Sequence, residues 1–235
     1  MKLHRLLLSV LTLSLVGCAH TPPDEPSDPL EPFNRAMFSF NLTADKYLLR
    51  PVAKGYDAVA PNFVRQGVSN FFRNLGEPRT VINDVLQGKL LQASSDTGRF
   101  LLNTTAGFVG VLDVATNAGL PRHQEDFGQT IGSYGIGQGW YLMLPLLGPT
   151  TNRDLIGRGA DYFATVTSYT ENEVAYPLTG AELVNQRAYL LPADSLLDDA
   201  LDKYVFVRTA YLQQRLNKVY EGSPPHKLLY GDDAE

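Results

Sequence analysis

The chain has 235 residues, of which 44% are hydrophobic, and a formal net charge of −5 at neutral pH. An acidic chain with scattered lysines and arginines is a poor nucleic-acid binder, and it lacks the polybasic patch that would hold it to anionic lipid. Cys18 is the only cysteine, which excludes a disulfide within the chain. The apolar content fits an ordinary soluble core as well as a protein held at a membrane.

The first 17 residues have the features of a lipoprotein signal peptide. Lys2 and Arg5 form its positive end, residues 6–16 form its apolar run, and Leu-Val-Gly precedes Cys18. The run is too short to cross a bilayer as a helix. We therefore expect cleavage before Cys18 and acylation of its sulfur, with an ordinary secretory signal as the alternative. Ala19 follows where an Asp would retain the protein at the inner membrane, which favours the outer membrane.

Four segments are expected along the chain. Residues 1–17 are the signal peptide, and residues 18–27 are a lipidated tether, flexible because it is rich in proline and acidic residues. Residues 28–221 are long enough to bury one core and are expected to form one helical domain. Residues 222–235 are expected to be a disordered acidic tail.

The domain opens with a helix that is predicted to begin at Asp28 and to end at Arg50-Pro51. An apolar stripe begins at Phe33, while Phe38 lies outside that stripe. A helix that is apolar on more than one side has more than one apolar neighbour. Those neighbours are either protein and lipid, or the two sides of a protein core.

A polar stripe runs beside the apolar one on the same helix, formed by Asn34, Asn41 and Asp45. Shorter helices follow, each interrupted by Gly or Pro, and an apolar, glycine-punctuated segment covers residues 108–115. Breaks that frequent suit segments that bend around something rather than a straight bundle. The expected helices cover residues 52–59, 63–75, 79–87, 89–105, 155–169, 180–191 and 195–220.

The chain is organised around residues 127–154. Glycines at 135, 137 and 139 leave one face of an extended chain without side chains, which permits close backbone approach or a tight hairpin. The apolar block 140–147 follows, and then a Gly-Pro turn and Arg153-Asp154. The block is expected to be either a buried hairpin or an apolar insertion into the edge of a membrane.

Motifs of enzymes are missing from the sequence. His123 is the only histidine of the expected domain, so a metal site or a serine hydrolase would depend on that single imidazole. Ser133 lacks the spacing of a nucleophile elbow, and no phosphate-binding loop is present. We therefore expect no catalytic residue, no metal and no cofactor.

The chain resembles the MlaA/VacJ family of outer-membrane lipoproteins in several motifs that occur in order. These are DPLEPFNR (28–35), RFLLNTTAG (99–107), the glycines of 128–139 with Leu144-Pro145, Gly148-Pro149 and Arg153-Asp154, and YVFVRTAYLQQR (204–215). One departure is Trp140, where a proline is expected after the glycine.

The resemblance implies a mostly α, ring-like single domain of broken amphipathic helices with one short β-like hairpin. Family members lie in the inner leaflet of the outer membrane and associate with porin trimers. They remove phospholipid misplaced in the outer leaflet through a polar channel, and they pass it to a periplasmic carrier of the MlaC type. Such a passive device needs an apolar exterior and a polar lining, because a charged headgroup crosses hydrocarbon only at high cost.

Two groups of site residues follow as hypotheses. Residues expected to line or gate the channel are Asn34, Asn41, Asp45, Arg153 and Asp154, although each could equally cap a helix or face the periplasm. Residues expected to face the membrane or the porin are Phe33, Phe38, Trp140, Leu142 and Leu144. Two rival functions are a structural lipoprotein that braces a porin and a lipase that uses His123.

Overall fold

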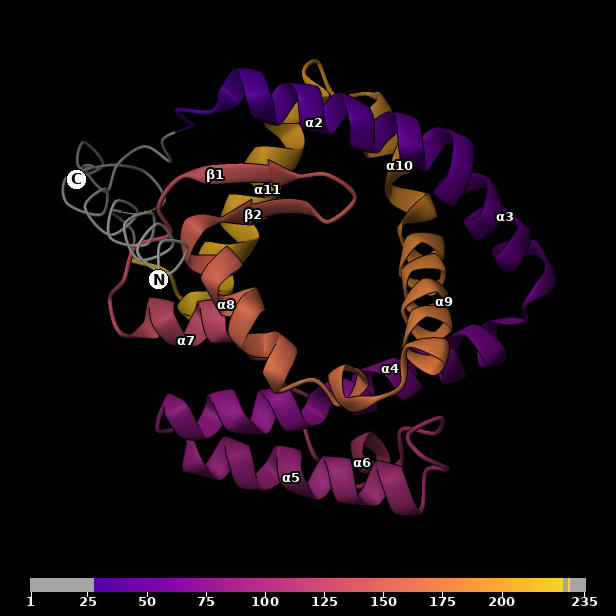
Figure 1. Cartoon of the computed structure of the whole chain (residues 1–235). Helices are drawn as coiled ribbons and strands as arrows, with labels where there is room; N and C mark the ends of the chain where they lie inside the picture. The colour runs from indigo at the N-terminus through magenta and orange to yellow at the C-terminus, as the bar shows by residue number, and fades with distance from the viewer. Residues whose placement is uncertain (1–27, 226–227, 229–235) are drawn as a thin grey trace, which may run out of the picture.

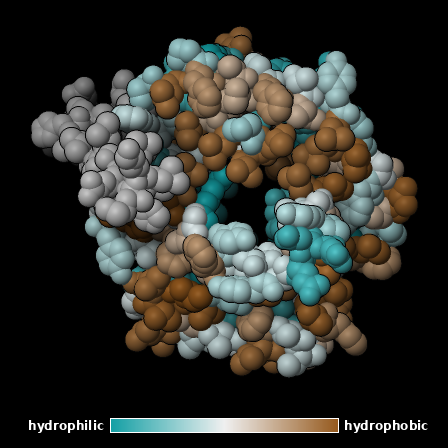
Figure 2. Space-filling view, viewed as in Figure 1, coloured by the Kyte–Doolittle hydropathy of each residue, from teal (hydrophilic) through white to brown (hydrophobic). Residues whose placement is uncertain are grey.

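The computed structural model describes residues 28–225 and residue 228, and this part of the chain forms a ring (Figure 1). The predicted signal peptide, Cys18 and the tether lie outside the described residues. The helices α2 (Glu31–Ala44), α3 (Arg50–Val59), α4 (Asn62–Leu86), α9 (Asn172–Leu190) and α8 (Asn152–Phe163) surround a central opening. The space-filling view shows that the side chains leave this opening unfilled (Figure 2). The expected mostly helical ring is confirmed.

The remaining elements complete the ring or pack against it. Helix α5 (Leu90–Thr105) lies along the outer side of α4, and α11 (Lys203–Val219) lies beside the hairpin (Figure 1). The shorter elements are α6 (Val114–Asn117), α7 (Phe127–Ser133), η3 (Val166–Tyr169), η4 (Leu191–Ala193) and α10 (Asp194–Asp198).

The first predicted helix does not end at Arg50-Pro51. A π-helical turn, η2 (Asp45–Leu49), joins α2 directly to α3. The backbone N–H of Arg50 donates to the carbonyl of Asp45, five residues earlier. Proline has no N–H and its ring clashes with the preceding turn, so the wider π turn lets the helix continue past Pro51 and curve around the ring.

Two predicted helices, 63–75 and 79–87, are one helix, and Pro78 lies inside α4. One face of α4 is polar along its length and packs against a polar face of α5. We call this interface the polar seam; its buried residues are Asn70, Asn74, Glu77 and Asp84 of α4 and Asp96, Arg99 and Asn103 of α5. Contacts along the whole seam hold α4 together across the proline.

The hairpin consists of β1 (Tyr141–Leu144) and β2 (Gly148–Thr151), which pair antiparallel with Tyr141 opposite Thr151. Residues 145–147 form the turn, so Gly148-Pro149 begins β2 rather than forming the turn itself. At the start of the segment 127–154, residues 127–133 form helix α7, whose first turn is capped by the Asp126 carboxylate, and residues 136–139 before the hairpin are not helical.

A small aromatic cluster joins the hairpin to its neighbours. Phe38 of α2, Tyr141 and Met143 of β1, and Tyr204 and Leu212 of α11 are buried together. The rings of Phe38 and Tyr141 both pack edge-to-face on Tyr204. The expected helix over 195–220 is interrupted before α11, because Asp202 is extended and its carboxylate accepts from the backbone N–H groups of Tyr204 and Val205.

The distribution of side chains is inverted relative to a water-soluble domain. Among the described residues, 21 polar or charged residues are buried against nine hydrophobic ones, while Val59, Phe63 and Leu91 are 83%, 77% and 89% exposed. Apolar side chains cover much of the outer rim, and hydrophilic side chains border the opening (Figure 2). An exterior of this kind marks a surface that contacts lipid or protein. Within the described part of the chain, no helix combines the length and the apolar character needed to cross a membrane.

Candidate functional site

Elements from several sides of the ring line a cavity of 640 Å³. Its wall is formed by α4, the loop before α7, the η3 segment, α9 and one side chain of α11. Most of the side chains in this wall are polar. The lining includes Phe72, Arg73, Leu75, Glu77, Arg79, Thr80, Arg122, His123, Gln124, Thr167, Glu182, Gln186 and Gln214.

Three arginines and two glutamates give the cavity its charge. Arg73 and Arg79 project from α4, and Arg122 comes from the loop before α7. Arg122 lies 3.6 Å from the Glu77 carboxylate. Burial raises the pKa of Glu77 to about 7, and burial also raises the pKa of Glu182. Glu77 therefore carries only part of its negative charge near neutral pH, and the three guanidinium groups outnumber the two carboxylates in the wall.

Behind the wall, the polar seam contains a fully buried arginine. Arg99 donates two hydrogen bonds to Asp113, at 3.0 and 3.1 Å, and one to the carbonyl of Leu120 at 2.6 Å. Burial raises the pKa of Asp113, but its hydrogen bonds and the charge of Arg99 outweigh burial and hold that pKa at about 2. Asn103 also donates to Asp113, so the loop after α5 is held to the ring by paired charges rather than by an apolar core.

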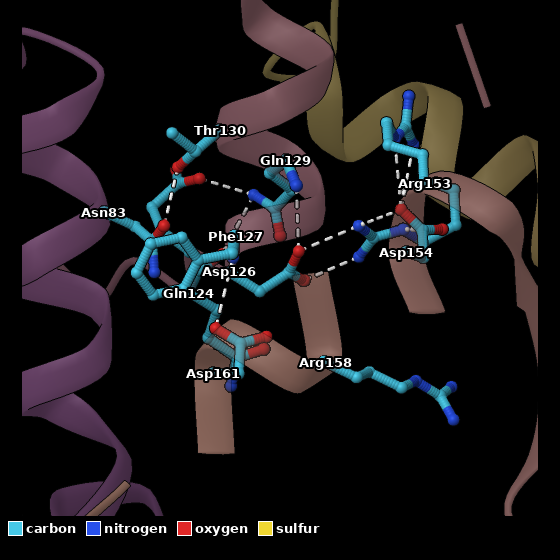
Figure 3. A network of polar contacts seen from close by, with 12 residues as sticks. Asn83, Gln124, Asp126, Phe127, Gln129, Thr130, Arg153, Asp154, Arg158 and Asp161 are labelled. Atoms are coloured by element: carbon cyan, nitrogen blue, oxygen red, sulfur yellow. Dashed lines mark hydrogen bonds and ion pairs between the residues drawn. The ribbon is translucent and has the colours of Figure 1, made fainter. Parts of the chain in front are cut away.

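A second ionic network joins α7, α8 and α11 (Figure 3). The Arg215 guanidinium donates to Asp126 at 2.6 and 2.8 Å and to Asp154 at 2.8 Å. Arg153 and the Tyr211 hydroxyl also donate to Asp154, at 3.1 and 2.8 Å. The network therefore holds together the elements that close the ring on the side opposite α9.

Two glycines allow α7 and α8 to pack closely at this junction. A Cβ atom at Gly128 would lie 2.5 Å from a carboxylate oxygen of Asp154 and 2.7 Å from Arg215. A Cβ atom at Gly157 of α8 would lie 2.3 Å from the backbone nitrogen of Gly128. Helices α7 and α8 therefore touch backbone to backbone, which only glycine permits.

Two asparagines of α2 bind the free edge of the hairpin. Asn34 donates to the carbonyl of Tyr141 at 3.1 Å and accepts from the N–H of Met143 at 2.8 Å. Two helical turns later, Asn41 donates to the carbonyl of Leu144 at 2.8 Å and accepts from the N–H of Leu146 at 2.7 Å. Each amide thus replaces a neighbouring strand, and together they cover an edge that would otherwise be unpaired.

None of the five residues predicted to line or gate a channel is in the wall of the cavity. Asn34 and Asn41 bind the hairpin, and Asp45 accepts hydrogen bonds from Arg187 at 2.7 and 2.9 Å. Arg153 and Asp154 are buried in the Arg215 network. The sequence thus identified polar residues that point into the protein, and the structure places them in the joints of the ring.

The residues predicted to face a membrane or porin divide into three groups. Phe33 and Trp140 are exposed, at 46% and 39%, and Leu142 and Leu144 are half-buried. Phe38 corrects the sequence interpretation, because it is 9% exposed and packs on Tyr204. It lies outside the Phe33 stripe because α2 also contacts the aromatic cluster on that side.

The sequence reasoning missed the arginines of the cavity wall. The signal that could have found them is the polar repeat at residues 70, 74, 77 and 84, which continues through Pro78 and marks one long helix. Splitting that helix at the proline hid both its buried polar face and the neighbouring face that carries Arg73 and Arg79.

His123 lies at the cavity and its Nδ1 is 2.9 Å from a carboxylate oxygen of the buried Asp96. Within the described residues, no hydroxyl or thiol is hydrogen-bonded to the other ring nitrogen of His123. The described residues also contain no group of three side chains placed to hold a metal ion.

Comparisons with known proteins agree on one relationship. Residues 26–218 match the family of MlaA lipoproteins. The chain is 42% identical over 220 residues to the intermembrane phospholipid transport system lipoprotein MlaA of Escherichia coli K12, covering 91% of this chain and 88% of that protein. It is 35% identical over 232 residues to the protein of the same name in Haemophilus influenzae, covering 94% and 93%.

A solved structure gives the same result for the fold. It is described as "Structural basis for maintenance of bacterial outer membrane lipid asymmetry" and matches with a TM-score of 0.75 at 40% identity. The match covers 84% of this chain and 100% of that chain.

Proposed function

Because this chain belongs to the MlaA lipoprotein family, we propose that it is an outer-membrane lipoprotein that removes misplaced phospholipid from the outer leaflet. The lipid headgroup passes through the opening of the ring, and the lipid is then handed to a periplasmic carrier of the MlaC type. The observation that carries this proposal is the inverted distribution of side chains around an open centre. An apolar rim suits hydrocarbon, while a polar wall replaces the water that a charged headgroup loses.

The cavity also has a suitable composition for part of a lipid. Its arginines and amides suit a headgroup, while Phe72 and Leu75 of α4 provide apolar surface beside them. The exposed apolar rim, including Phe63 and Leu91, suits the bilayer and a porin trimer, which we propose as the partner at the membrane. A transport device of this kind requires no chemical step.

Two neighbouring glutamines of α11 provide a matched test. Gln213 and Gln214 are both exposed, but only Gln214 lines the cavity. We expect Gln214→Trp to obstruct the opening and raise the amount of phospholipid in the outer leaflet, at unchanged protein level. Gln213→Trp adds the same bulk to the same helix outside the cavity, and should leave lipid asymmetry as in the wild type.

The same pair of positions distinguishes the rival functions. A photoreactive side chain at 214 should cross-link phospholipid inside the full-length protein, and one at 213 should not. Equal cross-linking at both positions, or none at 214, would remove the proposed path. A protein that only braces a porin would bind no lipid at 214, and its deletion would leave lipid asymmetry intact. A lipase would lose its activity in His123→Ala.

A further inference from the structure

The arginines of the cavity wall differ from most other arginines of the described chain in having few carboxylate partners. Eight arginines elsewhere pair with carboxylates, namely Arg35, Arg50, Arg65, Arg99, Arg153, Arg187, Arg208 and Arg215. Arg73 and Arg79 form no ion pair within the described residues. Arg122 has one long contact, 3.6 Å from Glu77, and Glu77 is shared with Arg99 at the same distance.

Arg73 and Arg79 thus have no carboxylate in direct contact, although Arg79 lies near enough to Glu182 and Asp161 to lower their pKa values against burial. Burial lowers the pKa of Arg122, and repulsion from Arg73 lowers it further. Two guanidinium groups that repel each other in a partly enclosed, polar cavity attract an anion strongly. Arg79 also has a buried Nε atom without a hydrogen-bond acceptor in the described chain.

The neighbouring side chains suit the same kind of ligand. Gln124, Gln186 and Gln214 line the cavity from three different segments, as does Thr167, so side chains able to donate hydrogen bonds surround it; the Gln186 amide also donates to Glu182 at 3.0 Å. Guanidinium groups match a phosphate in geometry, because their N–H donors form a planar fork that holds two oxygens at once. Leu75, beside Arg73 and Arg79 in the wall, offers apolar contact to the part of a ligand next to the phosphate.

We propose that Arg73, Arg79 and Arg122 form a phosphate-binding site in the wall of the opening. The site takes the phosphate of a phospholipid headgroup and favours headgroups of net negative charge, such as phosphatidylglycerol, over zwitterionic ones. This inference rests on the proposed transport function and adds a substrate preference to it. The anionic headgroup is favoured because the wall holds more positive than negative charge, so an added ammonium group gains little there.

The test measures lipid retained by the full-length protein in detergent, by native mass spectrometry. The protein is offered phosphatidylglycerol, phosphatidylethanolamine or diacylglycerol with the same acyl chains, and diacylglycerol lacks the phosphate. The test variant is Arg73→Gln combined with Arg79→Gln, since neither side chain has an ion pair whose loss would unfold the protein. Arg158→Gln is the control, because Arg158 is exposed and donates to backbone carbonyls outside the cavity.

The wild type should retain phosphatidylglycerol best and diacylglycerol least. In the double variant, the affinity for phosphatidylglycerol should fall about tenfold for each arginine removed, which is the change expected for one charge-assisted hydrogen bond. Diacylglycerol retention should not change, the double Lys variant should recover much of the affinity, and Arg158→Gln should behave as the wild type.

Three outcomes would overturn the site. The double variant could keep its phosphatidylglycerol affinity, or it could lose diacylglycerol to the same extent. Inorganic phosphate could bind to the lipid-free wild type and depend on the arginines while lipid retention does not, which would make the ligand a free phosphate. In the first two outcomes the transport function stands as long as the wild type retains lipid. A wild type that retains none of the three lipids would instead contradict transport itself.

Discussion

Arg215 is the side chain whose removal should most weaken the ring. Its side chain is 8% exposed and pairs with Asp126 and Asp154, which come from before α7 and from α8. Arg215→Ala leaves both carboxylates in place without this cation. Removal of one partner from a buried ion pair costs about 3–5 kcal/mol. Asp154 keeps Arg153 and the Tyr211 hydroxyl, so most of the loss comes from Asp126.

The assay is thermal unfolding of the full-length protein in detergent, followed by circular dichroism. For a domain of this size each kcal/mol moves Tm by about 2–4 °C, so the expected decrease is about 6–20 °C. Arg35→Ala is the matched control, because Arg35 also pairs with two carboxylates, those of Glu31 and Asp202, but its side chain is 41% exposed. Its decrease in Tm should be much smaller, since exposed ion pairs contribute little.

The pH dependence gives an independent check. Burial raises the pKa of Asp126, but the hydrogen bonds and charge of Arg215 outweigh it and hold the pKa below its ordinary value of 3.8. Burial likewise raises the pKa of Asp154, and Arg215 helps to hold that pKa below 3.8 as well. This stabilisation is present above pH 3.8 and is lost as the pH falls through the lowered pKa values. The deficit of Arg215→Ala should therefore be largest near neutral pH and shrink in acid. Equal melting of the Arg215 and Arg35 variants, or a deficit that grows in acid, would refute the reasoning.

Three further predictions concern other joints of the ring. Asn34→Ala should lower the free energy of unfolding by about 2–3 kcal/mol, because it leaves buried backbone groups of β1 unpaired. Hydrogen exchange at the Met143 amide should accelerate, and unchanged exchange would contradict a stabilising role of Asn34 at the hairpin. Gly128→Ala should lower Tm, because its Cβ would lie 2.5 Å from a carboxylate oxygen, whereas Gly137→Ala, with no atom within 4 Å, should not. Burial raises the pKa of Glu77 from 4.5 to about 7, so the folded state binds a proton that the unfolded chain releases, and wild-type stability should fall by up to about 3 kcal/mol as pH rises from 4.5 to 7. Burial also raises the pKa of Asp84 to about 7, so Glu77→Gln should lose only the part of this slope that Glu77 contributes in pH-dependent melting; equal slopes for the wild type and the variant would contradict the assignment.

The opening helix and the hairpin illustrate what could be predicted from sequence. The stripe that starts at Phe33 and the polar stripe of Asn34 and Asn41 identified a helix with different neighbours on different sides. The structure places the aromatic cluster and the hairpin on two of those sides. The apolar block at 140–147 was expected to form a buried hairpin or a membrane insertion; the structure forms a hairpin that is buried at Tyr141 and Met143 and exposed at Leu146 and Leu147 in its turn.

Two prolines caused the main errors in the helix ends predicted from the sequence. Pro51 and Pro78 each favour a helix end when only neighbouring residues are considered. In the structure, a π turn accommodates Pro51, and the long contact between α4 and α5 holds the helix across Pro78. Both compensations depend on wider backbone geometry or on a distant helix, so they carry no signal at the prolines themselves.

The sequence by itself determined the helical class, the position of the hairpin and the family, because these depend on local periodicity, turn residues and ordered motifs. Only the tertiary structure decided which face of each helix points inward. An amphipathic helix has the same pattern whether its polar side meets water outside or lines an opening inside. The packing of α5 on α4 buries Asn74, Glu77 and Arg99, and the closure of the ring leaves Val59, Phe63 and Leu91 on the rim. It also brings Arg73, Arg79 and Arg122 to one cavity, which no spacing along the chain could indicate.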